Sequence, residues 1–432
     1  MTKFQQIQEA MDQGSGKVAV RGWIYRERGS SKLKFVVLRD STNIIQCVID
    51  KSVVGEDKFQ IIKKAQIETS MTIFGEIKKE ERAPSGYEIH VKDFEVIGTC
   101  DTFPIGRDQS PEFLLDNRHL WLRSRRMTAI LKIRSTYVQA REEFFKTKGF
   151  WRFDAPILQP NQCEGGSTLF EVKYYKAKTF LSQSWQLYAE AGVFALEKIY
   201  NMGPTFRAEK SKTSRHLSEF WMAEAEAAWY DLHDITELAK EELKFCLKKV
   251  LEERKPELEI LERDIKKLEV AAKKKWPTIK YREALKVLKD KANMDVPFGK
   301  DLRTIEEEKI MEHFDTPVVV THYPKEVMAF YKPRDPEVSD EALCFDMLAP
   351  EGYGEIVGGS QRDTDIKAIE KCLKDEGEDP ANYKFYFDLR KYGSVPHSGY
   401  GVGVERVVAW MCGIDNIKDA IPFPRTMIRW SP

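Results

Sequence analysis

The stretch GPTFRAEKSKTSRHLSEF, residues 203–220, gathers side chains that could bind a phosphorylated ligand. Read as a strand, GPTFRAE places Arg207 and Glu209 on one face, because side chains alternate along a strand. An arginine binds phosphate oxygens through two parallel hydrogen bonds, and a carboxylate accepts a hydrogen bond from an amino group. Arg215 and His216 lie on the polar loop that follows. The hairpin predicts a nucleoside triphosphate site, the alternative being a surface hairpin with incidental ion pairs.

The next segment, FWMAEAEAAW (220–229), has the alternation of a second strand. Phe220, Met222, Glu224 and Glu226 point to one side, and the residues between them, Trp221, Ala223 and Ala225, point to the other. On the polar side, Phe220 offers an aromatic surface for a flat base.

The C-terminal stretch PHSGYGVGVER, residues 396–406, carries glycines at 399, 401 and 403. Glycine at every second position of a strand removes the side chains from one face, which leaves a floor for a planar ring. Arg406 then opens an apolar, helix-like run, and a helix N-terminus favours phosphate. The stretch lacks the third glycine of a dinucleotide-binding turn, and the chain has no G-x-x-x-x-G-K-S/T loop. The two motifs together indicate a triphosphate site built without a P-loop.

The elements that must position these motifs divide the chain by character. Residues 17 to about 100 alternate apolar and polar residues between turn residues, which predicts five strands and one helical stretch, DKFQIIKKAQ. This pattern is typical of a small closed barrel of the OB type, with a two-sheet sandwich as the alternative.

A Pro- and charge-rich segment over 101–126 is predicted to be a linker. Helical spacing begins at Met127 and ends at Lys148-Gly149, and strands and helices then mix as far as Pro432. We interpret the charged helical region 236–276 as solvated. We therefore expect an α+β chain with a barrel over 1–100, a linker over 101–126 and a second domain over 127–432.

The composition restricts the class of protein. The chain has 432 residues, with 69 Lys and Arg against 69 Asp and Glu, so any contact with nucleic acid must be local. The N-terminus lacks the apolar core of a signal peptide, and no apolar run is long enough to span a bilayer. The seven cysteines form no C-x-x-C pair. A reduced, cytoplasmic protein without membrane contact is expected.

Three motifs resemble those of the class II aminoacyl-tRNA synthetases. GFWRFDAPIL (149–158) is similar to motif 1, which puts Pro156 in the dimer interface of that family. TFRAE with RHLSEF is similar to motif 2, and GVGVER is similar to motif 3. The family core is an antiparallel sheet flanked by helices, and an OB barrel before it marks the aspartyl, asparaginyl and lysyl subgroup. Within it, nearly the whole chain resembles the asparaginyl enzymes of archaeal or eukaryotic type.

The resemblance implies ATP as a substrate. Arg207 would hold its α-phosphate and Glu209 its adenine amino group, while Phe220 would stack on adenine. The β- and γ-phosphates would be held by Arg215, His216 and Arg406. Arg207 and Arg406 would be the catalytic residues, since the attacking carboxylate is already ionised at neutral pH and needs no general base. Catalysis then consists of positioning and charge stabilisation.

Magnesium would assist this step. The stretch DMLAPEGYGEIVGGSQR (346–362) offers Asp346 and Glu355 as hard oxygen ligands, so Glu355 would belong to the ATP site as well. Related aspartyl enzymes carry a serine ligand three residues after the glutamate, where this chain has Gly358, and the Asp–Glu spacing here is two residues longer. The third ligand and the number of metal ions stay open.

The resemblance also implies an amino-acid site. The flap NQCEGGSTLFEV would bring Glu164 to the α-ammonium group, and Ser184 and Gln186 would help to bind it. Aspartyl enzymes hold the side-chain carboxylate of their substrate with a lysine after the tyrosine that corresponds to Tyr188, and this chain has Ala189 there.

Without that lysine, a buried substrate carboxylate would lack its main compensating charge. Arg362 can donate to a carbonyl oxygen, and Glu224 can accept from an amide NH₂, directly or through water. This pair favours L-asparagine over aspartate, which Glu224 would repel. Trp185 replaces the smaller residue or proline that is more usual there, and the sequence gives no reason for it.

For the barrel, the resemblance implies binding of the anticodon of tRNA(Asn). Phe35 and Gln46 would stack on and hydrogen-bond the central uridine, with Glu88 as a third contact. Arg28 would reach the neighbouring base. The alternative is that Phe35 belongs to the barrel core.

The expected function is ATP-dependent activation of L-asparagine to asparaginyl-adenylate and its transfer to tRNA(Asn), by a homodimer. One alternative is an aspartyl enzyme that charges one or both tRNAs. A second is an asparagine synthetase on the same core, for which the barrel would be superfluous. A third is a non-catalytic OB-fold RNA-binding protein, against which the intact ligand-binding residues argue: Arg207, Glu209, Glu355 and Arg406.

Overall fold

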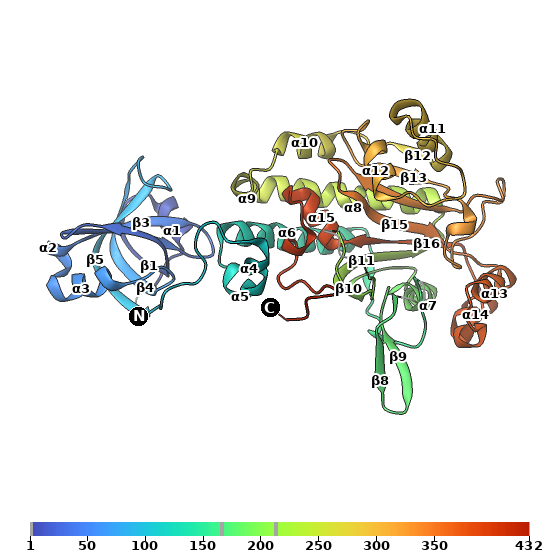
Figure 1. Ribbon diagram of the computed structural model, residues 1–432, viewed down its shortest axis with the longest axis horizontal. Helices are drawn as coiled ribbons and strands as arrows, with labels where there is room; N and C mark the ends of the chain where they lie inside the picture. Colours follow the sequence, from blue (N-terminus) through green and yellow to red (C-terminus); the bar gives the residue numbers. More distant parts are fainter. Residues whose placement is uncertain (1–2, 165–167, 211–214, 432) are drawn as a thin grey trace. The chain divides into compact units, whose positions relative to one another are not determined.

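The structure of the chain is a computed structural model, which describes residues 3–164, 168–210 and 215–431. The chain forms two compact units, Met1–Leu114 and Leu115–Pro432 (Figure 1). Their junction lies within the segment 101–126 that the sequence predicts as a linker. Among the described residues, no helix is both long and apolar enough to cross a bilayer.

The first unit is a closed barrel with the strand order β1-β2-β3-β5-β4. The strands are β1 (Gly16–Gly29), β2 (Leu33–Arg39), β3 (Ile44–Asp50), β4 (Ser70–Lys79) and β5 (Tyr87–Gly98), and the helices are α1 (Ile7–Gln13), α2 (Lys51–Val54) and α3 (Glu56–Lys64). Val20, Val36 and Ile73 are among the fully buried residues that fill the barrel. Because the sheet closes, the predicted OB barrel is confirmed and the sandwich alternative is wrong.

The second unit is built on an eight-stranded sheet with the order β12-β13-β14-β15-β16-β11-β10-β6. Its strands are β6 (Trp151–Arg152), β10 (Lys198–Phe206), β11 (Glu219–Ala228), β12 (Thr278–Lys280), β13 (Val318–Thr321), β14 (Cys344–Ala349), β15 (Gly354–Gln361) and β16 (His397–Gly403). From β13 to β10 neighbouring strands are antiparallel, and β12 and β6 join the two edges in parallel. The expected antiparallel sheet is confirmed, with parallel strands at its edges.

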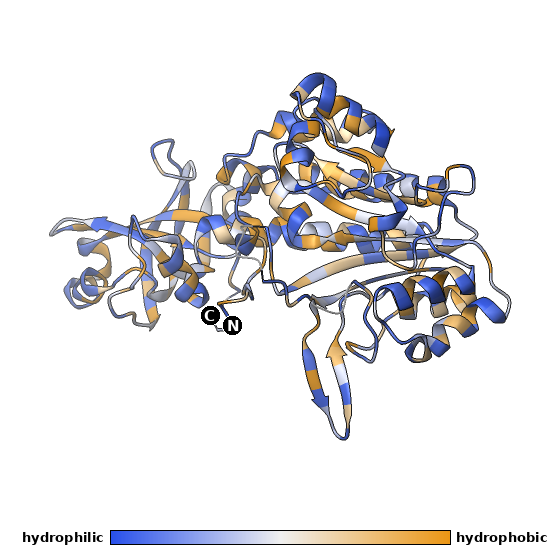
Figure 2. Cartoon of the chain, turned by 45° about the vertical axis from the view of Figure 1, so that its right-hand side comes forward, coloured by the Kyte–Doolittle hydropathy of each residue, from blue (hydrophilic) through white to orange (hydrophobic). Residues whose placement is uncertain are grey.

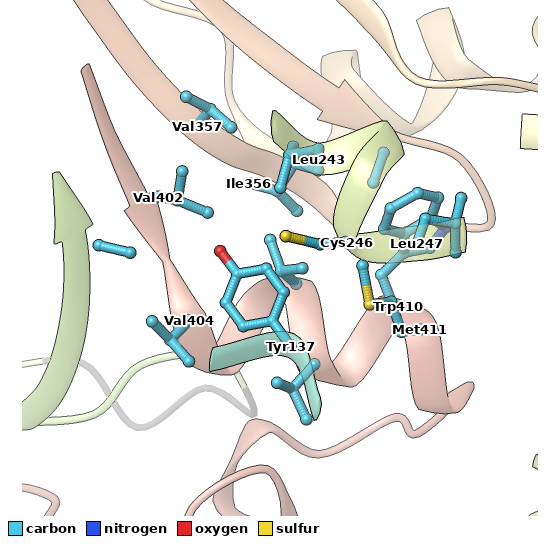
Figure 3. Close-up of a cluster of buried hydrophobic side chains, with 14 of the residues drawn as sticks. Tyr137, Leu243, Cys246, Leu247, Ile356, Val357, Val402, Val404, Trp410 and Met411 are labelled. Carbon is cyan, nitrogen blue, oxygen red and sulfur yellow. The ribbon is translucent and has the colours of Figure 1, made fainter. Parts of the chain in front are cut away.

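Three helices cover one face of this sheet: α6 (Arg125–Thr147), α8 (Leu232–Glu253) and α15 (Val404–Cys412). Figure 3 shows side chains from all three, including Tyr137, Leu243 and Trp410, gathered against Ile356 and Val402 of the sheet. The same pattern of mixed hydrophobic and hydrophilic residues runs along strands and helices in both units (Figure 2). One face of the sheet is therefore closed by the core, and the other carries the motifs.

The first unit ends and the second begins within α4 (Pro111–Asp116). The remaining elements of the second unit are α5 (Arg118–Trp121), β7 (Leu158–Gln159), β8 (Glu171–Tyr174), β9 (Ala177–Leu181), α7 (Gln186–Leu196), α9 (Lys255–Ile260), α10 (Ile265–Lys273), α11 (Tyr281–Ala292), α12 (Thr304–Met311), α13 (Ile366–Asp375) and α14 (Lys384–Lys391). Strands β7, β9 and β8 form a separate three-stranded sheet.

The region 236–276 is helical as predicted, but its charges are not all solvated. Glu242 of α8 is fully buried, and its Oε1 lies 2.8 Å from Nε of Arg141 on α6. Arg141 also donates to the carbonyl oxygens of Asn201, at 2.8 Å, and Glu224, at 2.7 Å. The prediction of a solvated face was wrong at Glu242, because its partner comes from a helix about a hundred residues earlier in the chain.

Candidate active site

One cavity on the open face of the sheet, with an empty volume of about 1060 Å³ including its mouth, collects the predicted residues of the second unit. Every residue predicted to bind ATP, amino acid or metal lines it: Glu164, Ser184, Gln186, Arg207, Glu209, Arg215, His216, Phe220, Glu224, Asp346, Glu355, Arg362 and Arg406. A concave site in which several charged and polar side chains converge is the usual place for a small-molecule ligand.

The floor of the cavity is set by the register of three strands. Strands β10 and β11 form the predicted hairpin, in which Phe206 pairs with Glu219. Strand β10 ends at Phe206, so Arg207 and Glu209 lie beyond it and not on the predicted strand face. Strand β16 lies beside β11 and pairs Gly401 with Glu224 and Gly403 with Met222. Both glycines line the cavity, as their spacing predicts.

Gly399 has a different role from the other two glycines. A Cβ at this position would lie 1.8 Å from Oε2 of Glu226 and 2.6 Å from NH2 of Arg362. The missing side chain therefore makes room for a buried ion pair.

Arg207 has a buried donor that points to a ligand. Among the described residues, its Nε has no hydrogen-bond partner, and its Cζ lies 5.5 Å from the ring centroid of Phe220. Burial alone would lower the pKa of Arg207, but the nearby carboxylates of Glu164 and Glu209 raise this pKa by more. The pKa therefore lies above its usual value, and the guanidinium stays charged. A buried unpaired donor is costly, and a phosphate oxygen would satisfy it.

The other predicted phosphate ligands have protein partners. Arg406 donates through NH1 to the carbonyl oxygen of Glu355, at 2.8 Å, and to its Oε2, at 3.0 Å. Arg215 donates to Oε1 of Glu308 on α12, at 2.6 Å. Burial lowers the pKa of His216 despite the charge of Glu209, whose Oε2 lies 3.4 Å away. Either ring N–H of His216 could donate to a phosphate oxygen.

Asp346 and Glu355 converge on the backbone of Gly358. A Cβ at Gly358 would lie 3.5 Å from Oδ1 of Asp346 and 3.1 Å from Oε1 of Glu355. Burial, and then the charge of Glu355, raise the pKa of Asp346 well above its usual value. A divalent cation between the two carboxylates would relieve this repulsion, so the donor set fits Mg²⁺. Gly358 itself offers no side-chain ligand.

Arg362, which also lines the cavity, is held by three hydrogen bonds. Its Nε and NH2 each donate to the Glu226 carboxylate at 2.8 Å, and NH1 donates to Oγ of Ser360 at 2.9 Å. These bonds use three of its five N–H groups. The ring of Tyr331 packs on the guanidinium, with 5.3 Å from Cζ to the ring centroid, and its hydroxyl donates to Oε1 of Glu164 at 2.7 Å.

Ser184 and Gln186 reach the cavity, but carboxylates of the protein engage both side chains. Ser184 Oγ donates to Oε1 of Glu224 at 2.6 Å, and Gln186 Nε2 donates to Oε1 of Glu190 at 3.0 Å. Burial raises the pKa of Glu224, which the hydrogen bond from Ser184 opposes. If these two side chains also bind the α-amino group directly, the substrate and the carboxylates of Glu224 and Glu190 must share them as hydrogen-bond partners.

Behind Arg362, a buried group of carboxylates and cations supports the site. Glu190, Glu226 and His397 offer ligand atoms within 4.8 Å of one another, which is close enough for a metal ion. Arg390 and Arg362 already pair with the two carboxylates, so the arrangement is an ion-pair network.

Sequence reasoning missed several of these supporting residues: Glu190, Ser360, Tyr331, Lys332, Arg390 and His397. They come from helices α7 and α14, from strand ends and from loops, and have no recognisable spacing in the sequence. Glu226 was the exception, because the alternation of β11 puts it on the same side as Glu224.

The four residues predicted to read an anticodon meet on neighbouring strands of the barrel. The guanidinium of Arg28 lies 5.1 Å from the ring centroid of Phe35, and its NH2 donates to Oε1 of Gln46 at 3.5 Å. Gln46 Nε2 donates to Oε2 of Glu88 at 2.9 Å. Phe35 is half-buried, whereas Val36 beside it lies in the barrel core, so Phe35 belongs to the outer surface.

Comparison with known proteins agrees with this architecture. Residues 110–427 match the family model of class II tRNA synthetases (D, K and N), and residues 18–97 match that of the OB-fold nucleic acid binding domain. The chain is 46% identical over 428 residues to the asparagine–tRNA ligase of Sorangium cellulosum, and 45% identical over 416 residues to that of Thermoplasma acidophilum. Each alignment covers 96% of both chains.

A solved structure gives the same result. The chain is similar to the crystal structure of asparaginyl-tRNA synthetase from Pyrococcus horikoshii complexed with asparaginyl-adenylate, with a TM-score of 0.96, 44% identity and 100% of both chains covered. The relationship inferred from three short motifs is confirmed. The chain belongs to the class II aminoacyl-tRNA synthetases of the D, K and N group and, within that group, to the asparagine–tRNA ligase family.

Proposed function

We propose that this chain activates L-asparagine with ATP and transfers the asparaginyl group to tRNA(Asn). The observation that carries the proposal is that one cavity is lined both by the arginines proposed to bind phosphate and by Arg362 and Glu224, proposed to read the amide. The substrate carboxylate attacks the α-phosphorus of ATP, and pyrophosphate leaves. A ribose hydroxyl of the tRNA then attacks the activated carbonyl carbon, and AMP leaves.

Arg207 and Arg406 stabilise charge in the first step. The unpaired Nε–H of Arg207 donates to the α-phosphate, where negative charge develops in the transition state. Arg406 lies near the N-terminus of α15 and, with Arg215 and His216, binds the departing pyrophosphate. Glu209 and Phe220 bind adenine by hydrogen bonding and stacking.

Asp346 and Glu355 would hold Mg²⁺, which when bound supplies positive charge to the phosphates. Gly358 contributes only space.

Recognition of asparagine rests on a neutral amide. The amide oxygen accepts from the N–H groups of Arg362 that Glu226 and Ser360 leave over, and the amide NH₂ donates to Glu224. Glu164, held by Tyr331, pairs with the α-ammonium group, with Ser184 and Gln186 beside it. An aspartate carboxylate would face Glu224 without a lysine at position 189 to compensate it.

The outer surface of the barrel binds the anticodon of tRNA(Asn), with Phe35 stacking on a base and Gln46, Glu88 and Arg28 contacting base edges. The cytoplasm remains the predicted location.

The proposed partner of the chain is a second copy of itself. Strand β6 ends the sheet, and exposed apolar side chains lie in and near motif 1, with Trp151 63% and Ile157 43% exposed. An interface there would cover this apolar surface and include Pro156. Sedimentation of Trp151→Glu against the unaltered chain tests it: monomers are expected for the variant, and a monomeric unaltered chain would contradict the proposal.

The deciding experiment is ATP–pyrophosphate exchange driven by asparagine or by aspartate. Exchange with asparagine is expected, and exchange with aspartate alone would show an aspartyl enzyme. Release of free asparagine from aspartate and ammonia, without tRNA, would show an asparagine synthetase.

Arg207→Ala is expected to reduce the exchange rate by at least about 100-fold, since it removes a transition-state donor. Arg82→Ala, whose side chain is 94% exposed, serves as the control and keeps the full rate. Retained exchange in Arg207→Ala, with a folded protein, would contradict the role of this arginine.

A further inference from the structure

Trp185 connects Glu224, which lines the active-site cavity, to the motif 1 segment 149–158. It is buried, and its backbone N–H donates to Oε2 of Glu224 at 3.1 Å. Its indole Nε1–H donates to the carbonyl oxygen of Phe153 at 2.7 Å. One residue thus contacts both the carboxylate proposed to read the amide and the backbone of the 149–158 segment.

The same carbonyl oxygen receives a second hydrogen bond from the strand that pairs with Glu224. Asn201 Nδ2 donates to Phe153 O at 2.9 Å and to Oδ1 of Asp154 at 3.0 Å. Asn201 stands opposite Glu224 in the β10–β11 register. The backbone of Glu224 and its carboxylate are therefore both tied to Phe153, one through Asn201 and the other through Trp185.

A second cavity lies behind Glu224. It is lined by Trp185, Asn201, Asp154 and Pro156, among others, and shares only Glu224 with the active-site cavity among the described residues. Glu224 therefore forms part of the wall between the two. Trp185 lies on the far side of that wall, so its indole does not touch the substrate.

We propose that Trp185 is a positioning residue for asparagine recognition, which acts by fixing the Glu224 carboxylate against motif 1. The proposal rests on the role of Glu224 in the proposed function. Glu224 accepts from Ser184 Oγ and from Trp185 N, and these two donors determine which lone pairs remain for the amide NH₂. The indole hydrogen bond fixes the backbone that carries both donors, as a supporting contact fixes a ligand-binding side chain.

Trp185→Phe tests this proposal, because phenylalanine keeps an aromatic ring but removes the indole N–H. In pyrophosphate exchange we expect the KM for asparagine to rise about tenfold, the effect of one lost hydrogen bond, with the KM for ATP within twofold of its original value. A purely structural role would not separate the two substrates. If Trp185→Phe does not fold, Asn201→Ser removes the second donor to Phe153 O and is measured in the same way.

Trp276→Phe is the matched control. Like Trp185, Trp276 is buried, and its Nε1–H donates to a backbone carbonyl, that of Ala271 at 2.8 Å. Unlike Trp185, it has no hydrogen bond, among the described residues, to a residue proposed to bind asparagine, and neither tryptophan lines the active-site cavity. This variant is expected to lower the melting temperature and to leave the KM for asparagine unchanged. An unchanged asparagine KM in Trp185→Phe, or equal rises for both substrates, would overturn the proposal.

Glu224→Gln separates this proposal from its premise. If it leaves the KM for asparagine unchanged, the role of Glu224 in the proposed function is wrong. If it raises that KM while Trp185→Phe does not, only the positioning role of Trp185 fails.

Discussion

At the scale of single residues, the Arg362–Glu226 pair shows that a buried ion pair needs space beside the backbone. Both side chains are buried and bonded through two N–H···O contacts, which leaves neither free to move. Such a pair is stable only if nothing else occupies its space, and Gly399 of β16 provides that space. The alternate glycines were predicted as a floor for a ring, and at this position the glycine serves an ion pair.

Gly399→Ala is therefore expected to disrupt the amino-acid site. The new Cβ would lie 1.8 Å from Oε2 of Glu226, so the pair must shift. Because a misplacement of about 1 Å can reduce a rate 100-fold, we expect asparagine-driven exchange to fall by about that factor. Gly106→Ala is the control, since its Cβ would meet nothing closer than 3.7 Å. Full activity of Gly399→Ala would mean that Arg362 does not bind the substrate.

Which residues line the cavity was predictable where a motif carries them, as for Arg207, Glu209 and Arg406. The hydrogen-bond partners were not. Ser184 was expected to contact the substrate, but the sequence did not show that its hydroxyl donates to Glu224, which comes from a strand forty residues later. Such pairings depend on tertiary contacts that carry no local signal.

At the scale of elements, helix α6 was predicted from its apolar spacing, and its most consequential contact was not. Arg141 of α6 binds the buried Glu242 and two strand carbonyls, including that of Glu224. The spacing of apolar residues predicts which face of a helix is buried, but it does not predict a charged residue within that face.

A second ion pair, which is partly exposed, connects the helices to the sheet and gives a pH-dependent prediction. Glu351, between β14 and β15, accepts from Arg263 at 2.6 and 3.0 Å and from Lys267 at 2.9 Å. Burial raises the pKa of Glu351, but these hydrogen bonds lower it below its usual value. A carboxyl whose pKa is lower in the folded state stabilises the protein above its unfolded pKa, and this stabilisation is lost as the pH falls.

Glu351→Gln is therefore expected to reduce the free energy of unfolding by about 1–3 kcal/mol at pH 7, and by progressively less as the pH falls below about 4. Urea denaturation at several pH values measures the difference. Asp375→Asn, which breaks the exposed pair with Lys371, should change stability by less than about 0.5 kcal/mol. A loss for Glu351→Gln that is equal at every pH would contradict the ionic origin of the effect.

At the scale of the whole molecule, the change from alternating strands to helical spacing predicted two folded parts, and the structure has two compact units. The barrel was predictable because each short strand carries its own alternation and turn residues. The order of the large sheet was not, because its neighbours β11 and β16 are far apart in sequence.

This division predicts that Phe35→Ala affects the second reaction step only. Every residue proposed for adenylate formation lies within Leu115–Pro432, while Phe35 lies in the barrel. Loss of a stacked base costs about 1–3 kcal/mol, so the KM for tRNA should rise about tenfold or more while pyrophosphate exchange is unchanged. Ile61→Ala, on an exposed residue of the barrel helix α3, is the control. An equal fall in both assays would contradict the separation.

Among the described residues, the apolar cores of the two units have no member in common: with partly buried side chains included, the barrel core ends at Val96, and the core beside the large sheet begins at Trp121. In the proposed function, the surface that contacts the anticodon and the cavity that selects the amino acid are therefore built around separate cores. A chimaera that carries the barrel of a relative with another anticodon preference would still activate asparagine but would attach it to the wrong tRNA. Errors of translation would then follow although each unit works correctly.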